Sequence, residues 1–120
     1  MGITRVDIKV CSTDTPEICR TVRGAIVDTG ATVSAIPAKI INELGIKLPF
    51  KTKLTLATGK SVVRPVGIAI IEYDGRKAFD EVIAIERGSP LLSVTALQRM
   101  GFEVEPKTRK LKKLEGALLL

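Results

Sequence analysis

Apolar and polar residues alternate along most of the chain with the two-residue period of β-strands. Residues 3–10 alternate between aliphatic and polar side chains, and residues 18–27 lead to the apolar end Ala25–Val27. Further strands are expected over residues 52–56, 62–63, 66–73, 77–86 and 102–104. Because successive side chains of a strand point to opposite faces, this alternation predicts a sheet with one buried face.

Two short segments show the spacing of helices instead. Residues 37–44 place aliphatic side chains on one face and begin at Pro37, a residue that suits the first helical position. Residues 93–100 begin at Ser93, a favourable N-cap, and are followed by Gly101, a favourable helix stop. The pattern therefore predicts one or two short helices in a mainly β fold.

Turn-forming residues separate the expected strands. Ser12–Pro16 is a cluster of turn formers, and Ala57–Lys60 forms a second polar turn. Asp74-Gly75 is the strongest hairpin signal in the chain, because this pair tolerates the positive φ angles of a two-residue turn. The strands on either side of it are expected to pair.

The composition fits one domain with a small aliphatic core. The chain has 120 residues, 45% hydrophobic, with three Phe, one Tyr and no Trp. We expect a single domain over residues 1–120, with its core at about 3–111 and a C-terminal tail at 112–120. Oligomerisation would add stability to a domain with a core of this size.

Several function classes are disfavoured by what the sequence lacks. The absence of His removes Ser-His and Cys-His catalysis and His-ligated metal sites, so we expect no metal and no cofactor. The longest apolar stretch, residues 66–71, is far shorter than the roughly 20 residues of a membrane span. With no signal-peptide pattern at its start, the chain is expected to be a cytoplasmic protein with no membrane partner.

The two cysteines, Cys11 and Cys19, flank the first turn-rich loop. Two are too few for a structural zinc site. The sequence favours two free thiols, and a disulfide across the hairpin remains the alternative, most plausible in a hyperthermophile.

The chain has a net charge of +6, and part of its basic residues are clustered near the C-terminus. Five basic residues follow Pro106 within one short run: Lys107, Arg109, Lys110, Lys112 and Lys113. Such a run can contact phosphates, but no aromatic residue is interleaved for base stacking. We therefore interpret it as a solvated segment and do not expect a nucleic-acid partner.

Asp28-Thr29-Gly30 is the one cluster that suggests chemistry. It directly follows a predicted buried strand, is followed by Ala31, and is matched later in the chain by Leu91-Leu92-Ser93 before the second predicted helix. The alternative for Asp28 is an ordinary turn after a strand. Turns explain Asp14 and Asp74 in the same way, and surface solvation is the explanation we expect for Asp80.

These ordered features resemble the retropepsin-like aspartic protease family over about residues 3–111. The resemblance implies a closed acid-protease barrel, hydrolysis of peptide bonds in peptides or unfolded proteins, and a homodimer. It implies that Asp28 is the catalytic carboxylate and that Thr29 hydrogen-bonds the partner's loop. Gly30 would allow close backbone approach, and Ala31 would line the cleft.

The same resemblance assigns supporting roles elsewhere. Leu91 and Leu92 would pack behind the catalytic loop, and the turn Thr58-Gly59-Lys60 matches the tip of the substrate-binding flap in order and spacing, although not in glycine content. The family usually has Gly where this chain has Ser93, which we interpret as a helix cap and a tolerated change. The alternative function is a catalytically weak or inactive dimeric peptide-binding module of the same fold.

Two carboxylates that share one proton can hydrolyse an amide without a metal. Since the chain has one such loop, the second carboxylate is expected from a symmetry mate. More surface must join the interface, and the segment after Gly101 is the expected source. The alternative, that this segment packs on its own domain, stays open.

Overall fold

The computed structural model describes residues 2–56 and 58–114, and β-strands dominate this part of the chain. In chain order the elements are β1 (Arg5–Cys11), β2 (Cys19–Asp28), β3 (Ser34–Pro37), α1 (Ala38–Glu43), β4 (Phe50–Thr55), β5 (Ser61–Tyr73), β6 (Arg76–Ile85), β7 (Leu91–Ser93), α2 (Val94–Met100), β8 (Phe102–Val104) and β9 (Leu111–Lys113). The prediction of a mainly β fold with one or two short helices is confirmed.

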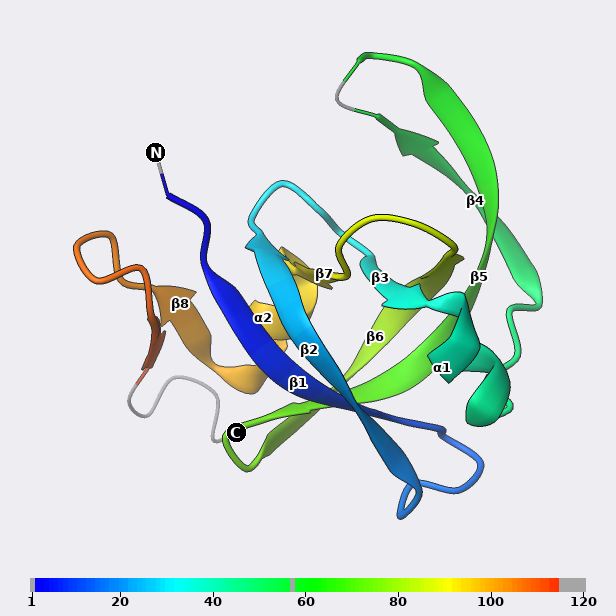
Figure 1. The fold of residues 1–120 in the computed structure, drawn as a ribbon, viewed down its shortest axis with the longest axis horizontal. Helices are drawn as coiled ribbons and strands as arrows, with labels where there is room; N and C mark the ends of the chain where they lie inside the picture. Colours follow the sequence, from blue (N-terminus) through cyan, green and yellow to red (C-terminus); the bar gives the residue numbers. More distant parts are fainter. Residues whose placement is uncertain (1, 57, 115–120) are drawn as a thin grey trace.

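Seven of the strands form one sheet in the order β1-β2-β7-β3-β6-β5-β4. β1 also pairs with β5. The six strands from β1 to β5 in this order therefore form a closed sheet. The seventh strand, β4, pairs with the first half of β5, and this β4–β5 hairpin extends away from the body (Figure 1).

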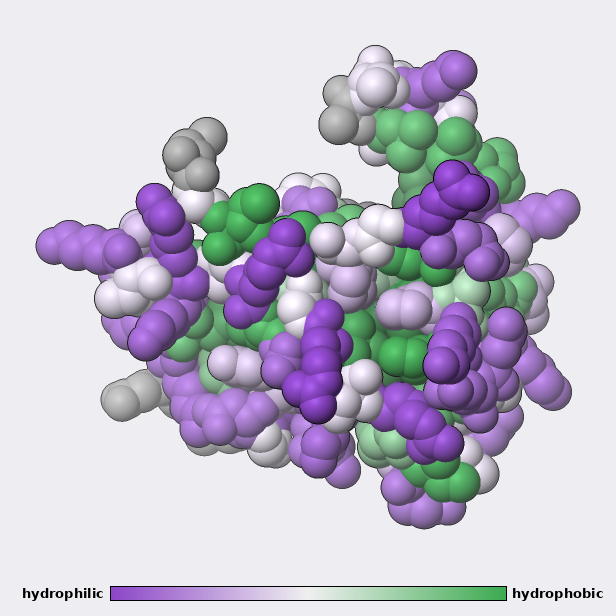
Figure 2. All heavy atoms as spheres, in the orientation of Figure 1, coloured by the Kyte–Doolittle hydropathy of each residue, from purple (hydrophilic) through white to green (hydrophobic). Residues whose placement is uncertain are grey.

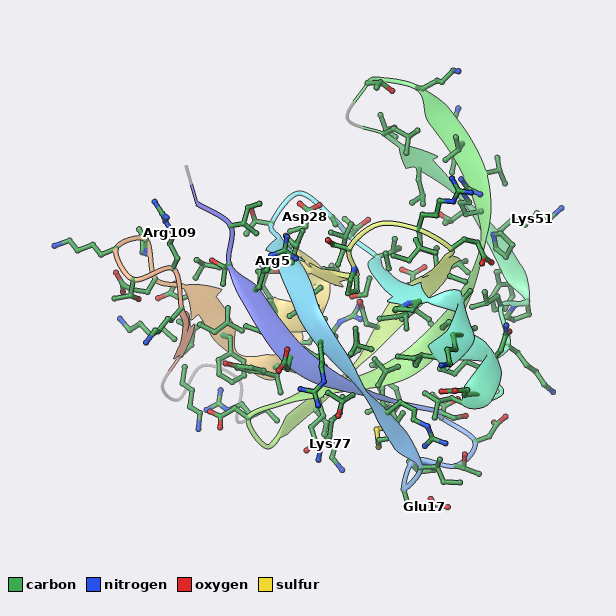
Figure 3. All side chains as sticks on the ribbon, in the orientation of Figure 1. Arg5, Glu17, Asp28, Lys51, Lys77 and Arg109 are labelled. Carbon is green, nitrogen blue, oxygen red and sulfur yellow. A yellow bond between two sulfur atoms is a disulfide. The ribbon has the colours of Figure 1, made fainter. Side chains whose placement is uncertain are left out.

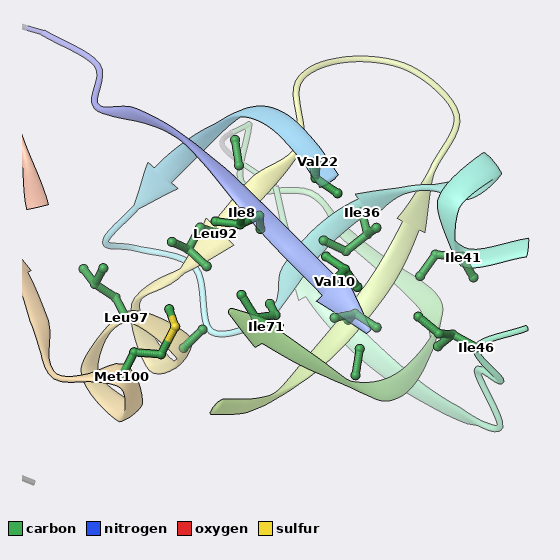
Figure 4. Close-up of a cluster of buried hydrophobic side chains, with 14 of the residues drawn as sticks. Ile8, Val10, Val22, Ile36, Ile41, Ile46, Ile71, Leu92, Leu97 and Met100 are labelled. Atoms are coloured by element: carbon green, nitrogen blue, oxygen red, sulfur yellow. The ribbon is translucent and has the colours of Figure 1, made fainter. Parts of the chain in front are cut away.

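The alternation of β1 explains how the sheet encloses the core. Ile8 and Val10 are fully buried while Asp7 and Lys9 are exposed. The core that these side chains enter is almost entirely aliphatic (Figure 4). Its labelled members come from five strands, two helices and the segment after α1: Ile8, Val10, Val22, Ile36, Ile41, Ile46, Ile71, Leu92, Leu97 and Met100.

The hairpin predicted at Asp74-Gly75 is confirmed. Tyr73 pairs with Arg76 across a two-residue turn, and both turn residues have positive φ angles, 50° for Asp74 and 78° for Gly75. This backbone twist matches the twist of the two flanking strands. The aromatic ring of Tyr73 in turn packs edge-on against Phe102, with ring centroids 5.2 Å apart.

Besides β7 and β9, which were not expected as strands, two further strands differ from the sequence prediction. β3 was not expected; Ser34, Ala35 and Ile36 are all buried, so this strand shows no alternation. β5 runs without interruption through Pro65, whereas two separate strands were expected. At that point β5 pairs with β4 alone, so the missing N–H of proline breaks no ladder on its other side.

The prediction of two free thiols is wrong, because Cys11 and Cys19 form a disulfide. They occupy directly opposed positions at the ends of β1 and β2, with their Cα atoms 4.2 Å apart. Intracellular disulfides are rare outside hyperthermophiles, so the cytoplasmic location stays a prediction that would need such a source. In the described part of the chain, no helix has the length and apolar character of a membrane span.

The first two residues of the predicted C-terminal tail, 112 and 113, belong to a strand. Residues Leu111–Lys113 form β9, which pairs with β8, and Val104 and Leu111 pack against the core of this chain. Residues 115–120, which include the apolar end of the predicted tail, lie outside the described residues. Part of the segment after Gly101 therefore contacts its own domain, and its role in an interface stays a prediction.

Candidate active site

Asp28 is the last residue of β2, and its side chain is half-buried at the end of the strand (Figure 3). The short strand β7 runs parallel to this end of β2 and pairs Val27 with Leu92 and Asp28 with Ser93. The loop after Asp28 therefore starts beside the point where β7 turns into α2. This arrangement places Leu91-Leu92-Ser93 next to the Asp28 loop, as the resemblance implied.

Backbone N–H groups of the loop bind both the carboxylate and the carbonyl oxygen of Asp28. The Gly30 N–H donates to Asp28 Oδ1 at 2.9 Å, and the Ala31 N–H donates to the Asp28 carbonyl oxygen at 3.1 Å. The Val94 N–H donates to the Ala31 carbonyl oxygen at 2.9 Å and so ties the loop to the start of α2. Thr29 is exposed at the tip of this loop.

Ser93 is fully buried and caps α2. Its hydroxyl accepts the Ala96 N–H at 3.0 Å, which satisfies one of the unpaired donors at the helix start. Leu92, beside it, is fully buried in the core, and Leu91 is half-buried. The interpretation of Ser93 as a helix cap is confirmed.

Asp80 is not a solvated surface residue, and that prediction is wrong. Its side chain is 1% exposed and accepts hydrogen bonds from three hydroxyl groups. Ser34 and Ser93 both reach Oδ2, at 2.6 and 2.8 Å, and Thr95 reaches Oδ1 at 2.9 Å. Charge-assisted bonds of this kind are among the stronger ones in proteins and offset the cost of burying the carboxylate.

The hydroxyls around Asp80 join the Asp28 loop to its support. Ser34 also accepts the Ser93 N–H at 3.0 Å, and the Thr95 hydroxyl lies 2.9 Å from the carbonyl oxygen of Thr32. The network therefore links three segments distant in sequence: the end of the Asp28 loop, β6 and the start of α2. We call Asp80, Ser34, Ser93 and Thr95 the Asp80 network.

Sequence reasoning missed three members of the Asp80 network, although one signal was available. Asp80 lies on the same face of β6 as Ala78, Val82 and Ala84, which pack in the core. An acid on the buried side of a strand requires partners. Those partners come from β3, the end of β7 and the first turn of α2, and neither the β3 strand nor these contacts are visible in the local pattern.

The predicted flap residues lie apart from Asp28, at the tip of the β4–β5 hairpin. Thr58, Gly59 and Lys60 are exposed, and Gly59 has a φ of 87°. The turn is closed by two backbone bonds, from Leu56 N–H to the Lys60 carbonyl oxygen at 2.7 Å and from Gly59 N–H to the Leu56 carbonyl oxygen at 2.9 Å. Figure 2 shows the hairpin standing away from the body, with open space on the side where Figure 3 places Asp28.

This open space is not an enclosed cavity of the described chain. Two surface hollows, of about 180 and 260 Å³, lie elsewhere: one near Ser12 and Phe50, the other near Lys9 and Tyr73. Neither is lined by Asp28. Within residues 2–56 and 58–114 the structure shows no group of three or more acidic or cysteine side chains that could hold a metal.

A family model described as aspartyl protease matches residues 17–91. This range includes the Asp28 loop and the β4–β5 hairpin and ends within β7. The comparison with curated protein sequences found no match.

Several solved structures share the fold. The EIAV protease, solved in complex with the inhibitor HBY-793, is 24% identical, with 82% of this chain and 89% of that chain covered and a TM-score of 0.54. The simian foamy virus protease is 18% identical over 78% of this chain and 92% of that one, with a TM-score of 0.52. The retroviral protease-like domain of Ddi1 from Leishmania major is 14% identical over 96% and 91%, with a TM-score of 0.55. The family model and the shared fold together show that this chain belongs to the aspartyl protease family, with a retropepsin-like fold.

Proposed function

We propose that the protein is an aspartic endopeptidase that works as a two-fold symmetric homodimer, with one Asp28 from each protomer forming the catalytic pair. The observation that carries this proposal is the placement of Asp28. Asp28 ends a strand of the closed sheet, its carboxylate is held by the Gly30 N–H, and it lies on the side of the body where the β4–β5 hairpin leaves open space. Membership of the aspartyl protease family supports the same assignment.

A pair of aspartates provides both an acid and a base at one site. Two carboxyl groups about 3 Å apart cannot both ionise, so one keeps its proton. The ionised group takes a proton from water, the water oxygen bonds to the peptide carbonyl carbon, and the other group gives its proton to the carbonyl oxygen. The first group then protonates the leaving nitrogen as the C–N bond breaks, and the second regains the proton from the diol oxygen.

The second Asp28 must come from another protomer. The chain holds one Asp-Thr-Gly sequence, and the one buried acid near the described loop, Asp80, has its oxygens engaged by three hydroxyls. Thr29, exposed at the loop tip, is the residue that we assign to the contact with the partner's loop. The open surface around Asp28 would become an enclosed cleft when two protomers meet.

The remaining predicted site residues receive supporting roles in this proposal. The β4–β5 hairpin, with Thr58, Gly59 and Lys60 at its tip, is the flap that closes over a bound peptide and excludes water. Ala31 lines the cleft beside Asp28. Leu91, Leu92 and Ser93 support the loop from below through the pairing of β7 with β2.

The test is cleavage of unfolded casein by the wild type and by Asp28→Asn at several pH values. The wild type should cleave casein best below neutral pH and lose activity as the pH rises, because the pair then loses its shared proton. Asp28→Asn should reduce cleavage by at least about a thousandfold, since it removes both the base and the shared proton. Asp14→Asn is the matched control, because Asp14 is an exposed turn residue, and it should keep full activity.

Undiminished cleavage by Asp28→Asn would overturn the assignment of the catalytic residue. A wild type that binds casein but leaves it intact at every pH would instead support the peptide-binding module of the same fold. A transition-state-mimicking aspartic protease inhibitor separates the cases further, because it should block true turnover at the pair.

A further inference from the structure

The pairing register of the β4–β5 hairpin divides its side chains into two faces. Residues directly opposite each other in an antiparallel pair lie on the same face. Leu54 pairs with Val62 and Thr52 pairs with Arg64, so these four side chains share one face. Because direction alternates along a strand, the neighbouring residues lie on the other face: Lys51, Lys53, Thr55, Ser61, Val63 and Pro65.

Burial shows which face is turned inward. Thr52, Leu54 and Val62 are half-buried, and Val66, two residues beyond Arg64, is 5% exposed, while Phe50, opposite Val66 at the base of the hairpin, is 66% exposed. Every residue of the other face is exposed. Lys51, labelled in Figure 3, points outward from the hairpin and away from the body. Arg64 therefore lies on the inner face of the hairpin, and its own side chain is exposed there.

No acidic residue is available nearby in the sequence to neutralise Arg64. Between Glu43 and Glu72 the chain contains five basic residues and no Asp or Glu. Elsewhere in the described chain basic side chains do form ion pairs with acids, for example Arg20 with Glu43 and Lys113 with Asp74. Among the described residues no acidic oxygen lies within 4.0 Å of the Arg64 guanidinium.

An unpaired guanidinium beside two aliphatic side chains on the inner side of a flap is a binding feature. The planar guanidinium of arginine can donate two parallel hydrogen bonds to a carboxylate. A carboxylate from a bound peptide would therefore pair with Arg64. Arg64 lies two residues farther from the hairpin tip than Val62. It is therefore placed to meet a side chain farther along the peptide than the one that contacts Leu54 and Val62.

Resting on the proposed function, we propose that Arg64 is a specificity residue: it selects peptide substrates that carry a glutamate or aspartate at an outer position, some residues away from the cleaved bond. The occupant of this part of the cleft is thus an acidic peptide segment. The cationic hairpin as a whole would attract such segments, and Arg64 would fix the position of the acid.

The experiment uses a peptide from casein that the protein is found to cleave. Each position outside the two residues flanking the cleaved bond is made Gln in one peptide and Glu in another, and kcat/KM is measured for each pair. At one position the Glu peptide should be cleaved about tenfold better than the Gln peptide, a factor that corresponds to about 1.4 kcal/mol. Added salt should reduce this ratio, because the contact is exposed.

Lys53→Gln provides the matched control for Arg64→Gln. Both changes remove one positive charge from the same hairpin, but Lys53 lies on the outer face. Arg64→Gln should bring the Glu-to-Gln ratio close to one, and Lys53→Gln should leave it near the wild-type value. Arg64→Glu should reverse the preference toward a Lys peptide, a gain that a misfolded variant cannot produce.

Two results would overturn the proposal. One is a wild-type ratio near one at every position of the peptide. The other is an equal fall of the Glu-to-Gln ratio in Arg64→Gln and Lys53→Gln. That result would mean that the overall positive charge of the hairpin, and not the Arg64 contact, sets the preference. In both cases Asp28-dependent cleavage of the Gln peptides would show that the proposed endopeptidase activity itself still stands.

Discussion

At the scale of single residues, Asp80 shows how a buried charge is kept in a small β fold. Its two oxygens accept hydrogen bonds from Ser34, Ser93 and Thr95, so the cost of removing the carboxylate from water is offset locally. The same hydroxyls contact Thr32 and the helix start at Ala96. One acid thereby connects the Asp28 loop to the elements that support it.

We predict that Asp80→Ala lowers the free energy of unfolding by roughly 3 kcal/mol, because it leaves buried hydroxyl donors without an acceptor. Asp80→Asn should cost less, since one oxygen acceptor remains and the hydroxyls can rotate to accept from the amide. Urea denaturation at fixed protein concentration measures both values. Asp14→Ala, at an exposed turn, should change the free energy by no more than about 0.5 kcal/mol. An equally small effect of Asp80→Ala would contradict the role of the network.

The contrast between Asp28 and Asp80 explains what single residues reveal in a sequence. Asp28 could be predicted because its context is local: a buried strand, Asp-Thr-Gly, and then Ala31. Asp80 has no local motif, and its partners approach from segments 46 and 13 to 15 residues away along the chain. The one signal of its burial was its position on the same face of β6 as Val82.

At the scale of elements, strands buried on one face were predictable and strands buried on both were not. β1 alternates clearly, and the Asp74-Gly75 turn fixes the pairing of β5 with β6. β3 is covered on both faces and lies between β7 and β6, so its residues give no alternation. The disulfide depended on register, because only the pairing of β1 with β2 places Cys11 opposite Cys19.

The Cys11–Cys19 disulfide should stabilise the fold by about 2–3 kcal/mol through loop closure, given a sequence separation of 8 residues. Reduction should lower the free energy of unfolding by this amount, measured with and without reductant at constant protein concentration. A Cys11→Ala/Cys19→Ala variant is the control and should not respond to reductant. A wild type that is equally insensitive would mean that the disulfide does not form.

The tip of the β4–β5 hairpin should be ordered by ligand. Thr58, Gly59 and Lys60 are exposed and bury little surface of their own, so local opening is expected to be easy. With a transition-state-mimicking aspartic protease inhibitor bound, amide exchange in the 58–63 segment should slow by at least about tenfold. Amides of β1, in the core, serve as the reference and should change little. Equal exchange at the tip with and without inhibitor would argue against a flap.

At the scale of the whole molecule, one protomer provides half of the proposed site. The closed sheet and the Asp28 loop lie within the described residues, but the second carboxylate of the proposed pair is not part of this chain. The β8–β9 pair packs on its own protomer through Val104 and Leu111, so residues 102–114 can contribute to an interface only with their outer surface. The sequence predicted the need for a partner from stoichiometry and the segment after Gly101 as an interface surface, and both stay predictions.

The most direct test of the shared site is a mixing experiment. Wild-type protein, at a concentration where it is fully dimeric, is incubated with increasing amounts of Asp28→Asn until subunits exchange, and casein cleavage is then measured. If each site needs one Asp28 from each protomer, mixed dimers are inactive, and a tenfold excess of the variant should reduce activity to about a tenth. An equal mass of an unrelated protein should leave activity unchanged. Full wild-type activity in the presence of excess Asp28→Asn, after subunit exchange has been shown, would mean that a single protomer suffices and would contradict the account.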